Sequence, residues 1–235
     1  MTRILAVFGV LTLYMGVAAS ASATVVDGST SGVFVNPAPN GAFVQGVGTD
    51  DFKFGQPFGG PASELIFAGD SFAGAPLETP FRVGTLTYKN GQVVAGTEAT
   101  AVDLSLTLNF TNPALGAVPN AFTLDLVSTP NVGTPQDSAD YVFFPTSFGS
   151  NTFDIGGTLY TVRLTGFSNI TGNGFLDSNG SRLHVLEGGV ASADLYAEVT
   201  SQTAAPEPAT WGLLLLGFAG LGLAGYRKGR KPVAI

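Results

Sequence analysis

The chain has 235 residues, no cysteine and a formal net charge of −7. Between Thr24 and Ala205, five Lys and Arg residues stand against sixteen Asp and Glu residues, so this stretch alone carries a net charge of −11. An acidic surface repels phosphates, so nucleic-acid binding is not expected. The lack of cysteine excludes disulfides, thiolate catalysis and cysteine-ligated zinc.

Residues 1–23 have the pattern of a secretory signal peptide. Arg3 supplies a basic start, residues 4–17 form an apolar run, and Ala21, Ser22 and Ala23 supply the small-residue cleavage motif. Such a three-part segment is removed after export. We therefore expect an N-terminal signal peptide helix that is cleaved after Ala23; the alternative is a short N-terminal membrane anchor.

Residues 24–203 are expected to form one all-β domain. From Ala42 onward apolar and polar residues alternate with a period of two, which is typical of strands with one buried face. The alternation is most regular at residues 102–110. It recurs at Phe122, Leu124 and Leu126, at Tyr160, Val162 and Leu164, at Leu183 and Val185, and at Ala193, Leu195, Ala197 and Val199.

This spacing predicts about ten strands in an antiparallel β-sandwich, jelly-roll-like in form, with no helix inside the domain. Turn-forming residues separate the predicted strands. The clearest predicted turns are Lys89-Asn90-Gly91, Asn112-Pro113, Thr129-Pro130-Asn131 and Gly172-Asn173-Gly174. No βα alternation occurs, so a parallel nucleotide-binding sheet is not expected.

The middle of the chain resembles the choice-of-anchor K domain, which occurs in exported proteins with differing C-terminal anchors. The resemblance covers most of residues 40–200 and implies no particular activity, since that family has no established one. It departs from the family at Phe54, where a Trp is expected. The stretches that carry the resemblance are residues 46–49 with Phe54-Gly55, residues 63–69, residues 81–91, residues 154–157, residues 160–162 and residues 195–197.

The domain offers little for catalysis or transition-metal binding. His184 is the only histidine, and its position between Leu183 and Val185 predicts a side chain on the solvent face. Residues 69–73 only loosely resemble a nucleophile elbow, so a Ser/His/Asp triad is not expected. One histidine without cysteine also cannot form a histidine-rich zinc or iron site. We predict no catalytic residue, no metal-binding residue and no cofactor.

Two alternatives for the domain stay open. Asp50-Asp51 and Asp177-x-Asn179 place oxygen donors on predicted loops, which would suit a calcium-dependent polysaccharide-binding module. Paired carboxylates could instead serve a hydrolase, although the sequence does not show that any two acids converge. Sugar stacking would depend on the tyrosines at positions 88, 141, 160 and 196.

The C-terminal segment, residues 204–235, has three consecutive elements. Pro206, Glu207 and Pro208 form a stiff entry, because each proline restricts its own backbone and that of the preceding residue. An uncharged apolar stretch runs from Trp211 to Tyr226, and including Ala209 and Thr210 it predicts a single transmembrane helix over residues 209–226. Trp211 and Tyr226 are placed as interfacial aromatic residues. The basic stop that follows, and that should stay cytoplasmic, consists of Arg227, Lys228, Arg230 and Lys231.

These three elements in this order resemble the PEP-CTERM sorting signal of Gram-negative bacteria. The resemblance implies that exosortase, a membrane-embedded transpeptidase-like enzyme, recognises the tail and cleaves near Pro206-Glu207-Pro208. It also implies transient membrane anchoring, then a place at the cell surface or in the extracellular matrix, with exopolysaccharide or biofilm. The expected function is therefore that of an exported, noncatalytic surface protein, with exosortase, membrane lipid and exopolysaccharide as partners.

Overall fold

The computed structural model describes residues 24–175, 180–203 and 208–229. The expected signal peptide, with Ala21 and Ala23, lies outside these residues. In the described part, the chain is mostly β-strand, every strand pair is antiparallel, and one helix follows the last strand.

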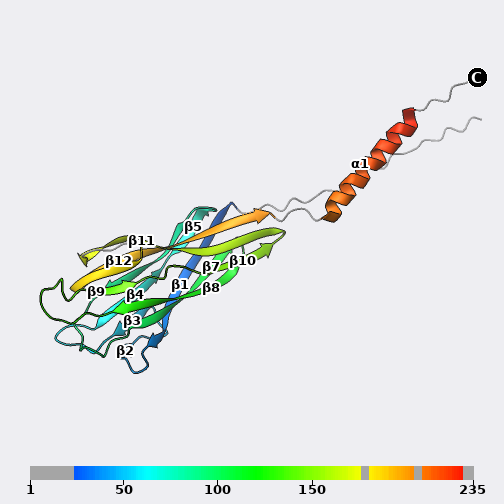
Figure 1. Ribbon diagram of the computed structural model, residues 1–235. Coiled ribbons are helices and arrows are strands. Elements are labelled where there is room, and N and C mark those ends of the chain that lie inside the picture. Colours follow the sequence, from blue (N-terminus) through cyan, green and yellow to red (C-terminus); the bar gives the residue numbers. More distant parts are fainter. Residues whose placement is uncertain (1–23, 176–179, 204–207, 230–235) are drawn as a thin grey trace, which may run out of the picture.

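The described residues contain twelve strands and one helix (Figure 1). Their bounds are β1 Val25–Ala38, β2 Val44–Gln45, β3 Asp51–Phe54, β4 Ser63–Gly69, β5 Ser71–Pro76, β6 Phe81–Lys89, β7 Ala101–Asn112, β8 Gly116–Val127, β9 Asp140–Phe143, β10 Ser150–Ile155, β11 Thr158–Phe175, β12 Arg182–Thr203 and α1 Pro208–Gly229.

One hydrogen-bonded sheet curls over on itself to make the domain. Its strand order is β2-β3-β4-β6-β12-β9-β8-β7-β1-β5, and a β10–β11 hairpin pairs with β12 through β11. Strand β1, near one end of this strand order, also contacts segments next to β3 and β4 at the other end. The Thr30 amide donates to Asp70 O, just after β4, at 2.8 Å, and the Phe34 amide donates to Thr49 O, just before β3, at 2.8 Å. The β3-β4-β6 part and the β7-β8-β1 part thereby become two facing layers, which confirms the expected β-sandwich-like arrangement.

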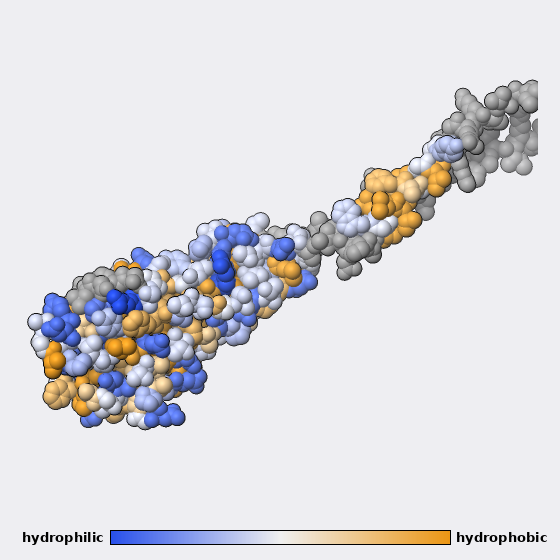
Figure 2. Space-filling model, in the orientation of Figure 1, coloured by the Kyte–Doolittle hydropathy of each residue, from blue (hydrophilic) through white to orange (hydrophobic). Residues whose placement is uncertain are grey.

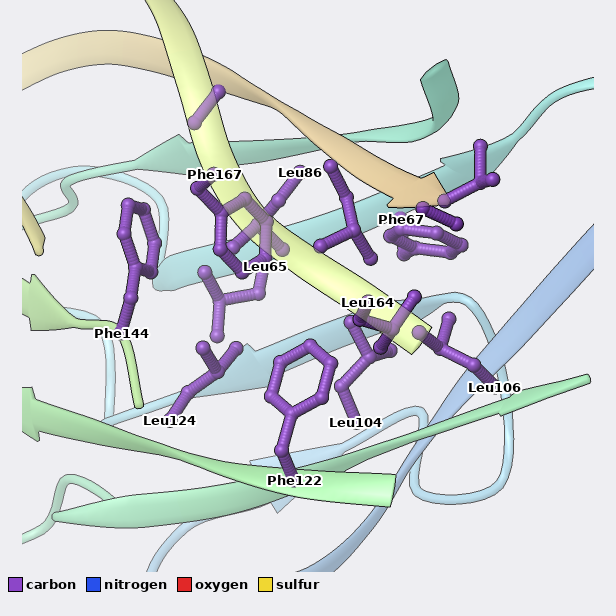
Figure 3. Close-up of a cluster of buried hydrophobic side chains, with 14 of the residues drawn as sticks. Leu65, Phe67, Leu86, Leu104, Leu106, Phe122, Leu124, Phe144, Leu164 and Phe167 are labelled. Carbon is purple, nitrogen blue, oxygen red and sulfur yellow. The ribbon is translucent and has the colours of Figure 1, made fainter. Parts of the chain in front are cut away.

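The core lies between these layers (Figure 3). Leu65, Phe67 and Leu86 extend from β4 and β6, and Leu104 and Leu124 extend toward them from β7 and β8. The burial of β7 alternates as predicted, with the even positions from Val102 to Phe110 buried. Each such side chain contributes about 1.5–3 kcal/mol when fully buried, so this alternation holds the layers together.

Strands β11 and β12 differ from the sequence prediction. The runs at residues 183–185 and 193–199 belong to one strand of 22 residues, and the predicted turn Gly172-Asn173-Gly174 is wrong, because these residues lie within β11. Gly172 serves close packing instead: a Cβ there would lie 2.2 Å from Val190 O. A glycine that gives room to a neighbouring backbone and a glycine that makes a turn look alike in a sequence.

Strand β12 is central and connects the domain to the tail. It pairs with β9, β6 and β11, and it ends at Thr203, five residues before α1 begins. Figure 1 shows α1 standing apart from the sheet. We call the end of the domain that faces away from α1 the distal end.

Candidate functional site

Helix α1 is the first candidate site, because its apolar surface is open to solvent. Trp211, Leu215 and Tyr226 are 59%, 69% and 63% exposed, and Figure 2 shows the strongest concentration of hydrophobic surface on this helix. The helix begins at Pro208, and proline suits the first helical position because its missing N–H would have no partner there. A helix that is apolar on all sides normally lies inside a protein core or in lipid.

The predicted sorting residues are only partly within the described chain. Pro208, Arg227 and Lys228 belong to the α1 backbone, whereas Pro206, Glu207, Arg230 and Lys231 lie outside the described residues. Within the described ranges, no helix combines the length and the apolar character needed to cross a membrane. The expected transmembrane helix over residues 209–226 is thus not confirmed.

The second candidate site is a pair of hollows that share one wall. A hollow of about 350 Å³ lies between residues 60–62, residues 89–92 and residues 187–190. A more open one lies on the other side of residues 186–190, against Pro135 and Gly172. Residues 187–190 therefore line both hollows.

Glu64 supplies charge at the rim of the first hollow. Its carboxylate pairs with the Lys53 ammonium at 2.6 Å and with the Lys89 ammonium at 2.5 Å. Burial acts to raise the pKa of Glu64, but the hydrogen bonds from the two lysines outweigh burial and lower the pKa to about 2. The carboxylate stays ionised at any ordinary pH, and each of its two oxygens pairs with one lysine.

Asp140, the first residue of β9, is 2% exposed. Its carboxylate accepts hydrogen bonds from the Thr129 amide at 2.7 Å, the Ser128 hydroxyl at 3.2 Å and the Tyr88 hydroxyl at 3.4 Å. Burial raises the pKa of Asp140 even so, and burial likewise raises the pKa of Tyr88, with the Asp140 charge as a further cause.

Glu187 is the least satisfied acid of the described residues. Both of its carboxyl oxygens are buried, and neither accepts a hydrogen bond there. Burial, followed by repulsion from Asp140, raises the pKa of Glu187 to about 7. Sequence reasoning missed Glu187 and Asp140; the only signal was an acid next to the Gly188-Gly189 pair within a strand-like run.

Within the described residues, the structure does not assemble the Ser/His/Asp triad or the metal sites that the sequence analysis considered. Ser71 lies on β5 at the margin of the sheet, whereas His184 lies on the central β12. Asp70, the acid of the elbow-like stretch, pairs with Arg82 at 2.6 Å. No group of three or more potential metal-ligating side chains occurs among the residues that the structure covers.

His184 is half-buried between the buried Leu183 and Val185, so it lies on the opposite face of β12 from them, as expected, and its imidazole stacks on the Tyr141 ring at 4.0 Å between centroids. This stacking covers one face of Tyr141, while Tyr88 and Tyr160 are buried. Of the calcium candidates, Asp51 pairs with Lys53 at 2.9 Å, and Asp177 and Asn179 lie outside the described residues.

Comparison with known proteins identifies the tail. A family model for the PEP-CTERM protein-sorting motif matches residues 204–231. The motif supports an exported protein that exosortase processes, with transient membrane anchoring before the cell surface. No curated protein matches the chain, and the resemblance of the middle part to the choice-of-anchor K domain is not confirmed.

Proposed function

We propose that the chain is a noncatalytic surface or matrix protein of a Gram-negative bacterium, whose β domain is delivered outside the cell and released from its tail by exosortase near Pro206-Glu207-Pro208. Exopolysaccharide or biofilm matrix is its proposed surrounding. The observation that carries this proposal is the sorting motif over residues 204–231, which coincides with an exposed apolar helix and the basic residues at its end.

The tail has the physical properties of a transient anchor. The uncharged run from Trp211 to Tyr226 spans about 24 Å as a helix, somewhat less than a hydrocarbon core of about 30 Å. Local thinning of the bilayer accommodates such a mismatch at a modest energy cost. A short anchor suits a segment that stays in the membrane only until it is cut, with the basic residues on the cytoplasmic side.

The noncatalytic part of the proposal is supported by the way the domain uses its acids. Glu64 pairs with two lysines, Asp70 with Arg82, and Glu198 with Arg163 at 2.5 Å. Asp140 and Glu187 are two neighbouring acids without a basic partner among the described residues, and a carboxylate hydrolase would need such a pair. Asp140 and both Glu187 oxygens are buried, however, so a substrate does not reach them in this conformation.

Calcium-dependent polysaccharide binding has less support, because Asp51 is already paired with Lys53.

The sorting proposal is tested by changing the motif in a producing cell. The triple substitution Pro206→Ala, Glu207→Ala and Pro208→Ala should block cleavage, so that the exported protein keeps the mass of the tail in mass spectrometry. Pro130→Ala, in a loop of the β domain, is the matched control and should be processed normally. If the triple variant shows the same mature mass and the same release as the unmodified protein, exosortase does not process the chain at this motif.

A further inference from the structure

Strand β12 passes from one layer of the domain to the other at residues 186–189, which we call the β12 corner. Residues 182–185 pair with β9, whereas residues 190–197 pair with β6. Across the corner the register with β11 jumps from Phe175 opposite Val185 to Asn173 opposite Val190, so the corner has no paired residue on β11. Strands that change layers do so through bends and bulges of this kind.

One buried residue of the neighbouring connection holds the corner closed. The Gly188 amide donates to Asn90 O at 2.9 Å, and the Asn90 amide donates to Gly189 O at 3.0 Å. The Asn90 side-chain amide donates to Val185 O at 3.0 Å. Gly188 has a φ of 72°, which a residue with a side chain rarely adopts. The corner is thus a short glycine-containing hinge, and the hydrogen bonds described here tie it to a single residue, Asn90.

The charges around Glu187 offer it no counterion. Asp140 of β9 faces it from the core, and Tyr88 of β6 lies close enough for its pKa to respond to the Glu187 charge. On the hollow side are Glu64 and Lys89, and the Lys89 ammonium is paired with Glu64. On the side of the second hollow, Pro135 and Gly172 are uncharged. An ionised Glu187 would therefore be buried beside a second acid, without a cation of its own among the described residues.

We propose that the β12 corner is a pH-operated gate, closed while the Glu187 carboxyl holds a proton and open when the proton leaves. A carboxylate whose oxygens are shielded from water and have no partner is unfavourable, whereas a neutral carboxyl is tolerated there. Swinging the corner outward lets the carboxylate reach water at the cost of the Asn90 hydrogen bonds. Because residues 187–190 are the wall shared by the two hollows, opening the gate joins them into one larger site.

The pH dependence of the gate lies in the mildly acidic range and ends near neutral pH. The pKa of Glu187 in the closed form is raised to about 7 by burial and by Asp140. Between the ordinary pKa of an exposed Glu, about 4.3, and this raised value, the open form is ionised while the closed form still holds its proton, so the ratio of closed to open form falls about tenfold for each pH unit; above about pH 7 both forms are ionised and the ratio stays constant. An exported β domain meets the pH of its surroundings directly, so the shape of the hollows would follow that pH. This gate belongs to the β domain and does not depend on how the tail is processed.

Amide hydrogen exchange of the full chain tests the gate. Protection of the Gly188 and Asn90 amides, corrected for the intrinsic pH dependence of exchange, should fall by up to about tenfold per pH unit as the pH rises from about 4.5 to about 7, and should level off above about pH 7. The ionisation of Glu187, followed by carboxyl NMR of the unmodified protein, should have its midpoint near the pH where the fall in protection levels off.

Two substitutions separate the gate from a general effect of pH. Glu187→Gln keeps the shape of a neutral carboxyl and should hold protection constant from about pH 5 to about pH 8.5. Glu98→Gln, at a carboxylate that accepts from the Thr97 amide at 2.8 Å, is the matched control and should behave like the unmodified protein. The proposal is overturned if protection in the unmodified protein does not change over this range, or if Glu187→Gln shows the same loss.

Discussion

At the residue scale, glycines decide how closely the two layers approach. A Cβ on Gly32 of β1 would lie 2.6 Å from Phe67 Cδ1 and 2.7 Å from Leu106 Cδ2, inside the core. Gly32→Ala should therefore destabilise the protein by about 1–3 kcal/mol, because the packed side chains around it have no space to move into. The loss is measured as a lower midpoint of urea unfolding with an unchanged slope.

Gly60→Ala is the matched control for this prediction. A Cβ at Gly60 meets nothing within 4 Å, and no left-handed backbone angle opposes the change. It should leave stability unchanged or raise it by up to about 1 kcal/mol through the unfolded chain. Equal midpoints for the two variants would show that Gly32 does not set the layer spacing.

At the scale of elements, the end of β12 is held by a turn from elsewhere in the sheet. Glu78, between β5 and β6, has a φ of 60°; its amide donates to Val199 O at 2.9 Å, and its carboxylate accepts from the Ser201 amide at 2.8 Å. The pairing of β12 with β6 stops at Ala197. Beyond that residue, the two hydrogen bonds from Glu78 hold the edge of β12 that β6 no longer pairs with. Glu78→Ala should cost about 0.5–1.5 kcal/mol locally.

The measurement for Glu78 is amide exchange at Ser201. Exchange in Glu78→Ala should be about two- to tenfold faster than in the unmodified protein, while amides in β7 stay unchanged. Glu78→Gln keeps an acceptor oxygen and should preserve most of the protection. Unchanged exchange in Glu78→Ala would mean that pairing with β11 alone fixes the end of β12.

The sequence predicts individual strands better than their connections. Alternation over residues 102–110 identifies β7, because every second side chain must be buried whatever its neighbour is. It does not show that β1 lies between β7 and β5, since that pairing depends on contacts between distant segments. The buried group of Asn90, Asp140 and Glu187 was missed for the same reason: its members are far apart in the chain and converge only where β12 changes layers.

At the scale of the whole molecule, two kinds of surface are separated along the chain. The β domain buries most of its large apolar side chains and pairs several of its acids with Lys or Arg, with Asp140 and Glu187 as buried exceptions, whereas α1 exposes leucines on all sides. The tail could be predicted from the sequence because its signal is local: a rigid proline pair, an uncharged run and a basic end within thirty residues. A membrane role for α1 depends on what surrounds the helix, so it is best tested on the precursor in the cell.

A charge placed in α1 tests that role. Leu215 lies within the apolar run from Trp211 to Tyr226, and its side chain is 69% exposed. Leu215→Asp should cost about 2.5–3.5 kcal/mol for a helix held in lipid, so the membrane-bound fraction of precursor should fall roughly a hundredfold relative to the free fraction. The measurement is membrane flotation of precursor that carries the Pro206, Glu207 and Pro208 substitutions, which keep the tail attached. Val132→Asp, at an equally exposed apolar residue between β8 and β9, should leave flotation unchanged; if both variants float like the unmodified precursor, α1 is not what binds the membrane.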